Sequence, residues 1–328
     1  MSNKPYIVFV TFDNYALKTM KPVHDIFERD PMTDSTCLLA ANNIGSLWQD
    51  PHVKKEVRYG LQGKKFGLGP IQLERKPDVL VGFRLWWGPD YMVAVSARRE
   101  NIPMVMINHG AMFIRNDAQK YKHNLAGAKV NCLWGKFDKD LWKYWNSRDD
   151  MFVVTGNPLH DNLTNYECPY IDVPDDFALL LTPRDRRKFI NPSVEALSKI
   201  MPIVAKTHPI DFEKDYYKQR YQTFDDPNTL LPLMYKAKII LANTSSAFIP
   251  ALFWQKPIFV HTFGSKGYYF EEFKEKTKHI FNFKQDAIWN EDIVGNAIKP
   301  TLEDFKLFGH IPDGKNSQRV AEVIKKYV

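Results

Sequence analysis

The stretch ILANTSSAFIPALFWQKPIFV, residues 240–259, places four small polar residues between two apolar segments. The segment before them is typical of a buried strand, and the one after them is typical of a helix that leads into a second strand. This order is that of a βαβ unit, so the stretch predicts a parallel α/β fold. The polar residues, Asn243 to Ser246, then have two explanations. They cap the free N–H groups at the start of the helix, or they use those groups to bind an anion such as phosphate.

The same alternation of short apolar runs and amphipathic stretches continues along the chain. Strands are expected at residues 6–12, 78–83, 103–108, 129–134 and 152–156, and again at 177–182, 201–208, 237–243 and 256–261. Helices are expected at 18–29, 90–100, 192–200, 246–254 and 291–299. Residues 162–176, NLTNYECPYIDVPDD, contain two prolines and several turn-forming residues, which indicates a linker. We therefore expect two α/β domains, 1–165 and 166–328, and leave open whether the last helix crosses back to the first.

Composition narrows the class of protein. The chain has 328 residues, 44% hydrophobic and 25% charged, as in a soluble protein of two domains. No stretch approaches the roughly 18 apolar residues that span a bilayer. The N-terminal MSNKPYIVFVTFDN leads into a strand rather than resembling a signal peptide, so we expect a cytoplasmic protein. A location at the periphery of the membrane, or in the cytoplasm of a virus-infected host cell, stays open.

Cysteine content and charge add two expectations. Cys37, Cys132 and Cys168 are far apart and odd in number, so each is expected to be a free, buried thiol. The formal net charge of +7 favours acidic partners, which include nucleotides, nucleic acid, an anionic glycan and an anionic membrane surface. The charge does not choose among them.

Polar residues gather directly after the expected strands. Parallel sheets bind ligands at the carboxyl ends of their strands, and a nucleotide diphosphate needs hydrogen-bond donors there. A turn, a cap or a solvated loop also explains each group taken alone. The groups are His109-Gly110, NPLHD at 157–161, PRDRR at 183–187, Lys206-Thr207-His208, and Asn243 to Ser246.

Together these groups carry a resemblance. VMINHGA, FVVTGNPLHD, LLLTPRDRR, VAKTHP and ANTSSAFIPALFWQKPIF occur in the order and approximate spacing of the CDP-glycerol glycerophosphotransferase family, which makes teichoic acids. The His-Pro and Ser-Ser pairs also resemble capsule transferases that use cytidine-activated sugars. The likeness spans residues 75–285. It implies a GT-B fold, in which two Rossmann-like parallel-sheet domains face a central cleft, and a transferase activity.

The resemblance also implies roles for single residues. His109 is the implied general base that deprotonates an acceptor hydroxyl, and His208 and Arg184 are implied to offset charge on the donor phosphates. Ser245 and Ser246 match the pair that binds phosphate. Further candidates come from the same loops and from the aromatic segments 83–92 and 264–273. The alternative explanations are that the aromatic side chains belong to the core and that the acidic residues of the second segment begin a helix. The candidates are Arg187, Lys206, Asn243, Thr244 and Glu271 for the donor, and Arg84, Trp86 and Gly110 for the acceptor.

Departures from the family leave the transferred group open. Asn243-Thr244 replaces the family's Asp-Tyr, and Asn108 stands where the family often has Trp. The donor is therefore expected to be a sugar or a polyol phosphate activated by CDP, CMP or UDP, and the acceptor an anionic glycan or teichoic acid-like polymer. No DxD motif follows a donor-domain strand. The Asp-Asp pairs at 149, 175 and 225 read as surface, so no cofactor and no essential metal are expected.

Three other functions stay open on the sequence. A virus-type glycosyltransferase that modifies hydroxymethylated bases in duplex DNA fits the compact chain and its basic segment VKKEVRYGLQGKKFGLG, residues 53–69. A UDP-sugar 2-epimerase would share the double α/β arrangement, but the clustered acid and base that it needs are not evident. A nucleotide-binding or DNA-binding module without turnover is the non-enzymatic alternative.

Overall fold

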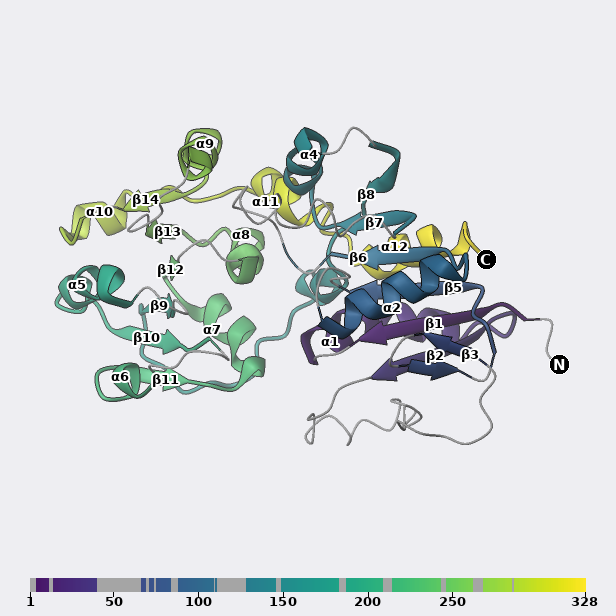
Figure 1. Ribbon diagram of the computed structural model, residues 1–328. Coiled ribbons are helices and arrows are strands. Elements are labelled where there is room, and N and C mark those ends of the chain that lie inside the picture. Colours follow the sequence, from purple (N-terminus) through teal and green to yellow (C-terminus); the bar gives the residue numbers. More distant parts are fainter. Residues whose placement is uncertain are drawn as a thin grey trace. The chain divides into compact units, whose positions relative to one another are not determined.

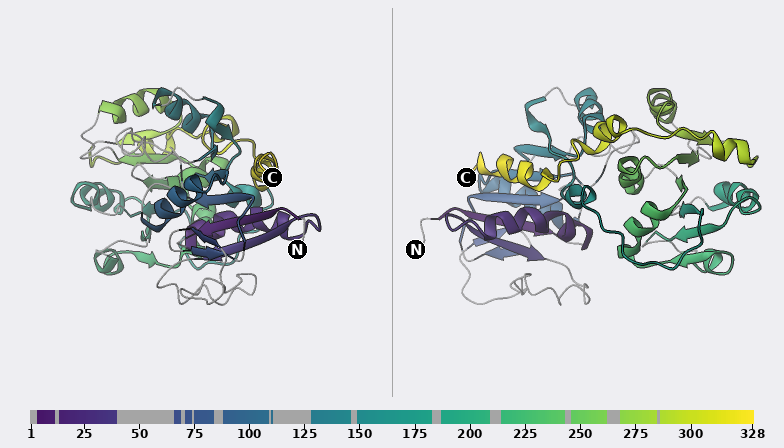
Figure 2. Two further views of the ribbon diagram at one scale, coloured as in Figure 1. Left: turned by 45° about the vertical axis from the view of Figure 1, so that its right-hand side comes forward. Right: turned by 180° about the vertical axis from the view of Figure 1, so that it is seen from behind.

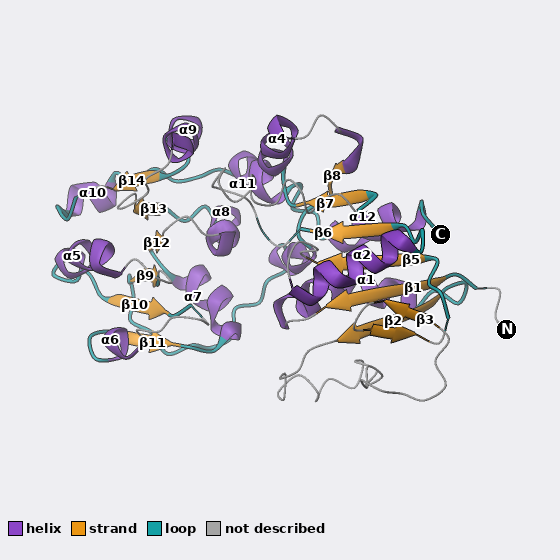
Figure 3. Cartoon of the chain, viewed as in Figure 1, coloured by secondary structure: helices purple, strands orange, loops and turns teal. Residues whose placement is uncertain are grey.

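The computed structural model describes residues 4–11, 14–39, 66–68, 71–73, 75–83, 88–108, 110, 128–145, 149–182, 187–208, 214–242, 246–261, 268–284 and 286–328. The chain divides into two compact units (Figure 1). The first holds the described residues up to Thr164 together with Phe308–Val328, and the second holds Asn165–Leu307. Each is built on a six-stranded sheet covered by helices, so the predicted parallel α/β class is confirmed (Figure 3).

The first sheet has the order β2-β1-β5-β6-β7-β8, and all its strand pairs are parallel. Five of these strands were expected from apolar runs. β2 was not, because its sequence DSTCLL is largely polar and it lies at the sheet edge, where one side needs no partner. The strands are β1 (Tyr6–Thr11), β2 (Asp34–Leu39), β5 (Val79–Phe83), β6 (Met104–Ile107), β7 (Val130–Leu133) and β8 (Phe152–Val154), with a separate antiparallel pair, β3 (Phe66–Leu68) and β4 (Ile71–Leu73).

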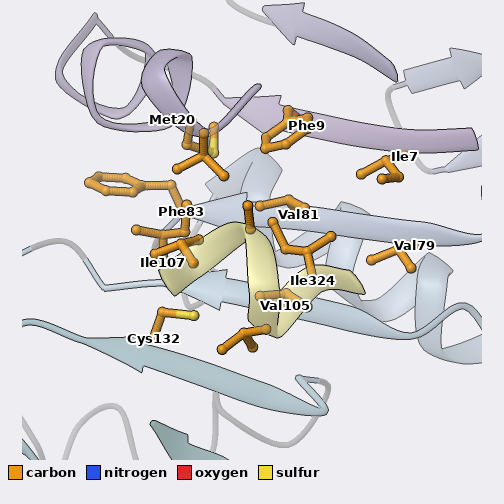
Figure 4. Packing of buried hydrophobic residues seen from close by; sticks show 14 of the residues in the cluster. Ile7, Phe9, Met20, Val79, Val81, Phe83, Val105, Ile107, Cys132 and Ile324 are labelled. Carbon is orange, nitrogen blue, oxygen red and sulfur yellow. The ribbon is translucent and has the colours of Figure 1, made fainter. Parts of the chain in front are cut away.

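Successive side chains of these strands point to opposite faces, and each face has its own core. Ile7 and Phe9 of β1 pack with α1 (Asn14–Glu28) and α12 (Asn316–Lys325), as Figure 4 shows for part of this cluster. Val8 and Val10 pack on the other face with α2 (Gly88–Arg99). Figure 2 shows α12 beside α1 when the molecule is viewed from behind. Among its described residues, this unit also contains the helices α4 (Lys136–Trp145), η3 (Asp149–Met151) and η4 (Pro158–Leu163).

The second sheet has the order β11-β10-β9-β12-β13-β14 and is also parallel throughout. Its strands are β9 (Ala178–Leu181), β10 (Ile203–Lys206), β11 (Gln222–Phe224), β12 (Ile239–Ala242), β13 (Ile258–His261) and β14 (Asn282–Lys284). The two edge strands, QTF and NFK, were not expected, since three residues are too few to show a pattern. No regular helix or strand forms from Thr164 to Phe177, as expected of the linker.

Helices cover both faces of the second sheet (Figure 1). One face of the sheet forms a core with residues of α5 and α6, including Leu197 and Tyr217. α5 begins five residues before the expected start, because Pro192 resembles the first residue of a helix but lies inside it. The helices are α5 (Arg187–Leu197), α6 (Lys214–Lys218), η5 (Pro227–Thr229), α7 (Leu230–Lys236), η6 (Ser246–Phe248), α8 (Ile249–Phe253), α9 (Tyr268–Thr277), α10 (Glu291–Gly295) and α11 (Leu302–Gly309).

Hydrogen bonds between buried or half-buried polar residues attach the C-terminal helix α12 to the first unit. The two carboxylate oxygens of Asp161 accept from the backbone N–H groups of Asn316 (2.7 Å) and Ser317 (2.9 Å). Asn316 also donates from Nδ2 to the carbonyl of Asn157 at 3.1 Å. Gly156 lies against these residues at φ +83°, where a Cβ atom would come within 2.0 Å of Asn316 Oδ1. The segment GNPLHD therefore holds α12 in place.

The cysteines only partly follow the expectation. Cys132 is buried and free, and burial raises its pKa to about 12. Cys168 is also free, but it is half-buried rather than buried, because it lies in the irregular linker. The side chain of Cys37 lies outside the described residues. In the part of the chain that is described, no helix has the length and apolar character needed to cross a bilayer.

Candidate functional site

The strand order of the second sheet indicates where along the carboxyl ends of its strands a ligand would bind. From β9, the chain builds outward to β10 and β11 on one side and to β12, β13 and β14 on the other. The carboxyl ends of β9 and β12 therefore form a topological switch point, which is where open α/β sheets bind their ligands. The loops that contain PRDR and Asn243 to Ser245 start at these two ends. Both loops lie outside the described residues, and the flanking Thr182, Ala242 and Ser246 lie within them.

Thr182 and His208 join the ends of β9 and β10. The backbone N–H of Thr182 donates to the carbonyl of Lys206 at 3.1 Å, which extends the pairing of the two strands by one residue. The hydroxyl of Thr182 accepts from the backbone N–H of His208 at 2.9 Å. This contact ties the residue after Thr207 to the end of β9. The His208 side chain is exposed beside the switch point.

Lys206, expected to bind the donor, is the last residue of β10 and is only 6% exposed. Its ammonium group donates to two backbone carbonyls, of Thr207 at 2.9 Å and of Asp225 at 3.4 Å. Burial lowers its pKa, and the nearby Asp225 opposes that shift. A buried cation whose hydrogen-bond partners are neutral carbonyls favours the approach of an anion.

Asp225 directly follows β11, and its side chain is 37% exposed, in agreement with the surface stretch expected for this Asp-Asp pair. Its Oδ1 accepts from the hydroxyl of Thr207 at 2.5 Å, and its Oδ2 pairs with Lys218 at 2.7 Å. Hydrogen bonds from Lys218 and Thr207 lower the pKa of this carboxyl group. Asp226 accepts from the backbone N–H of Asn228 at 2.9 Å and caps η5. The sequence did not reveal this connection because Thr207 and Asp225 are far apart along the chain.

Ser246 is the first residue of η6 and is half-buried. The α-helical turn proper, α8, begins only at Ile249, and its N-cap residue is Phe248, which makes no side-chain capping bond. Ser245 lies outside the described residues, so capping of this helical segment by a serine hydroxyl stays a prediction. An anion role for the Ser pair stays a prediction.

Two further charged or titratable residues end strands on the same edge and were not singled out from the sequence. His261 ends β13 and Lys284 ends β14, and both are buried. Burial and then the charge of Lys284 lower the pKa of His261 to about 4, so its imidazole is neutral at pH 7. Lys284 pairs with Asp286 at 2.9 Å and lies 4.8 Å from the centre of the Trp289 ring. A polar residue closing an apolar run, as in KPIFVH, is the signal that would have found His261.

The first sheet has its own switch point, between β1 and β5. Arg84 and Trp86 follow β5, and His109 follows β6, but all three lie outside the described residues. Gly110 is described and buried, and its carbonyl accepts from Nδ2 of Asn108 at 2.9 Å. The carbonyl of Asn108 accepts from the indole N–H of Trp134 at 2.9 Å. Asn108 thus connects Gly110 to Trp134 directly after β6.

The predicted site residues divide into three groups. Lys206, His208, Ser246 and Gly110 are described, and the first two meet at the ends of β9 and β10. Arg187 and Glu271 belong to α5 and α9, but their side chains are outside the described part. The others lie wholly outside it: Arg84, Trp86, His109, Arg184, Asn243, Thr244 and Ser245.

One group of potential metal ligands occurs among the described residues, and it lies elsewhere. His24 Nδ1 lies 3.7 Å from Asp25 and 3.9 Å from Glu28, near the C-terminal end of α1. Lys21 already donates to both carboxylate oxygens of Asp25, at 2.9 and 2.7 Å. α1 begins just after the carboxyl end of β1, so this group at the other end of the helix is not at the switch point of its own sheet.

Known proteins match the chain in structure alone. No protein-family model matches it, and no curated protein does. A solved structure of S. aureus MnaA with UDP has a TM-score of 0.70 at 16% identity, covering 98% of this chain and 96% of that one. The UDP-GlcNAc 2-epimerase of Neisseria meningitidis bound to UDP-GlcNAc has a TM-score of 0.63 at 15% identity, with 98% and 100% covered. The wall teichoic acid polymerase TagF, soaked with CDPG, has a TM-score of 0.59 at 12% identity, with 98% and 88% covered.

These likenesses define the fold class. The matches extend over nearly the whole chain and so include both units. The chain therefore has the two-domain α/β fold of the UDP-GlcNAc 2-epimerases and of TagF, and the GT-B type of fold expected from the sequence is confirmed.

Proposed function

We propose that this protein is a transferase that moves a sugar or polyol phosphate from a nucleotide-activated donor to a hydroxyl acceptor. The observation that carries the proposal is the edge of the second sheet, where Thr182, Lys206 and His208 meet beside the switch point of β9 and β12. Nucleotides bind at such points in open α/β sheets. Structures of the same fold were solved with UDP, with UDP-GlcNAc and with CDPG, which supports a nucleotide ligand.

In this proposal the donor phosphates lie over the ends of β9, β10 and β12. The buried ammonium group of Lys206, at the end of β10, supplies positive charge. His208 and Arg184 offset the charge that develops on the leaving nucleotide. Ser245 and Ser246 donate hydrogen bonds from hydroxyl and backbone groups. Four further residues complete the donor set: Arg187, Asn243, Thr244 and Glu271.

The first unit takes the acceptor. His109 is the proposed general base, because a neutral imidazole near pH 7 can accept the proton of the attacking hydroxyl. Arg84, Trp86 and Gly110 are proposed to orient the acceptor. The net charge of +7 favours an anionic glycan or a teichoic acid-like polymer. No cofactor and no essential metal enter the proposal, so transfer is expected to continue in a chelator.

The test is acceptor-dependent release of nucleotide. UDP-GlcNAc, CDP-glycerol and CMP-activated sugars are incubated with the protein, with and without a teichoic acid or capsular polysaccharide. One donor is expected to release nucleotide only when an acceptor is present, and His109→Ala is expected to lower the rate at least about 100-fold. His279→Ala, which removes an exposed histidine of the second unit, serves as the control. Full activity of His109→Ala would exclude His109 as the base.

A 2-epimerase is the second candidate, because several matching structures are UDP-GlcNAc 2-epimerases. Such an enzyme would convert UDP-GlcNAc without an acceptor, and the sugar product would distinguish it from a transferase in the same assay. The DNA glycosyltransferase alternative predicts transfer to hydroxymethylated duplex DNA and binding that weakens steeply with salt. Its basic segment, residues 53–69, lies mostly outside the described residues.

A further inference from the structure

Tyr15 lies at the switch point of the first sheet. β1 ends at Thr11, α1 begins at Asn14, and Tyr15 is the second residue of that helix. In the sheet, β1 is the direct neighbour of β5. In a sheet of this topology a ligand binds outside the carboxyl ends of the two strands at which the order reverses, and here these are β1 and β5. Tyr15 was not among the residues expected from the sequence to bind a ligand.

Two contacts hold the Tyr15 side chain in one orientation. Its ring meets the ring of Phe83, the last residue of β5, edge to face with centroids 5.8 Å apart. Its hydroxyl is hydrogen-bonded to the side chain of Asn157, which follows β8. Asn157 is itself fixed, since its Oδ1 accepts from the backbone N–H of Leu159 at 3.1 Å and its Nδ2 lies 3.3 Å from His160 Nε2. The ends of β5 and β8 therefore both restrain the ring.

The restrained ring is nevertheless accessible. Tyr15 is 38% exposed, whereas Phe83 and Asn157, which hold it, are each 1% exposed. Burial around its hydroxyl raises the pKa of Tyr15 above its usual value. The hydroxyl of Tyr15 therefore lies against a buried side chain, that of Asn157, while the residue as a whole keeps 38% of its surface exposed. Because the phenol stays protonated at neutral pH, it is not a base, and its role would be binding.

We propose that Tyr15 is a stacking platform for the carbon face of a sugar ring in the acceptor. A ring fixed at its hydroxyl and at its edge loses little conformational freedom when a ligand stacks on it, so most of the contact energy is retained. The assignment of the ligand as an acceptor sugar rests on the proposed transferase function. The position of the ring at the β1 and β5 switch point does not depend on that function.

The test uses saturation-transfer NMR with the methyl glycosides of glucose, galactose and N-acetylglucosamine as probes. Saturation of sugar C–H protons is expected with the wild-type protein, and Tyr15→Ala is expected to weaken binding about tenfold, the size of a favourable aromatic contact. Tyr15→Phe keeps the ring and should retain binding within about twofold of the wild type. Tyr170→Ala, which removes a tyrosine that is 88% exposed in the second unit, is the matched control and should bind as the wild type does.

Three results would overturn the platform: no saturation of any glycoside by the wild-type protein, equal binding by Tyr15→Ala, or equal losses in Tyr15→Phe and Tyr15→Ala. Binding of hydroxymethylated duplex DNA that requires the Tyr15 ring, with no glycoside binding, would assign the ring to a base instead. Nucleotide binding is measured on the same samples by thermal shift. Nucleotide binding without glycoside binding refutes the platform alone, and glycoside binding without any nucleotide binding refutes the proposed transferase alone.

Discussion

Lys206 carries a buried positive charge that a bound anion would stabilise. Its ammonium group is buried, and among the described residues it donates to two neutral carbonyls. The carboxylate of Asp225 already pairs with Lys218 and accepts from Thr207. Burying a charged group costs several kcal/mol, and for Lys206 the nearby carboxylates of Asp225 and Asp226 offset this cost only in part. A bound phosphate would offset that cost, so Lys206 should matter more for ligand binding than for stability.

His160 gives a prediction on pH. Burial lowers its pKa to about 3, against about 6.5 when exposed. Nδ2 of Asn157, which can only donate, faces His160 Nε2 at 3.3 Å and requires a neutral ring. Between pH 6.5 and pH 3 the unfolded chain therefore binds more protons at this site than the folded protein. Folding stability must fall as pH drops through this range, by up to about 1.4 kcal/mol per pH unit for each such histidine.

Urea unfolding at pH 7, 6 and 5 measures this effect. His160→Gln is expected to be less stable than the wild type at pH 7, because it disturbs the packing against Trp134, whose ring centroid lies 5.3 Å away. It is also expected to lose less stability between pH 6 and pH 5, since one proton-binding group is gone from the unfolded chain. Part of the dependence of stability on pH should remain in the variant, because the pKa of His261 is also lowered, to about 4. Identical slopes for variant and wild type would show that His160 titrates normally in the folded protein.

At the scale of elements, α12 depends on a residue far from it in sequence. Asp161 accepts from the first two N–H groups of the helix, which have no partner within the helix itself. A carboxylate there also interacts favourably with the helix dipole. Asp161→Ala is expected to lower the free energy of unfolding by about 1–3 kcal/mol, and Asp161→Asn by less, because the amide oxygen still accepts one bond.

Chemical unfolding of the two variants checks this. Asp172→Ala changes an exposed aspartate of the linker and should leave stability within about 0.5 kcal/mol of the wild type. Hydrogen exchange should be faster in α12 of Asp161→Ala than in the wild type. A variant as stable as the wild type would mean that packing of Val320 and Ile324 alone holds the helix.

The elements also mark the limit of what the sequence predicts. Strands with apolar runs such as VLVGF and ALLL were found, because strands buried on both faces are apolar throughout. The edge strands DSTCLL, QTF and NFK lack that signal. The strand-end rule found Lys206 and His208 but not Tyr15 or Asp225. Their importance comes from contacts with Asn157 and Thr207, which only the folded chain brings near.

At the scale of the whole molecule, two parallel sheets carry two separate switch points. The second sheet has the order of a dinucleotide-binding domain, and its edge holds Lys206, His208 and Thr182. The first has the order β2-β1-β5-β6-β7-β8, and its switch point holds Tyr15. A protein that joins a donor to an acceptor needs two such places. We propose that the nucleotide binds at the second sheet and the acceptor at the first.

The measurement that tests this account most directly is a thermal-shift panel with CMP, CDP, UMP, UDP, GDP and ADP. A ligand that binds only the folded protein raises its melting temperature. One pyrimidine nucleotide is expected to stabilise the wild type and the control His279→Ala but not His208→Ala. Lys206→Met is expected to lose the shift as well, although without ligand it should melt no lower than the wild type. No shift with any nucleotide, or an undiminished shift in both His208→Ala and Lys206→Met, would contradict the assignment of the nucleotide to the edge of the second sheet.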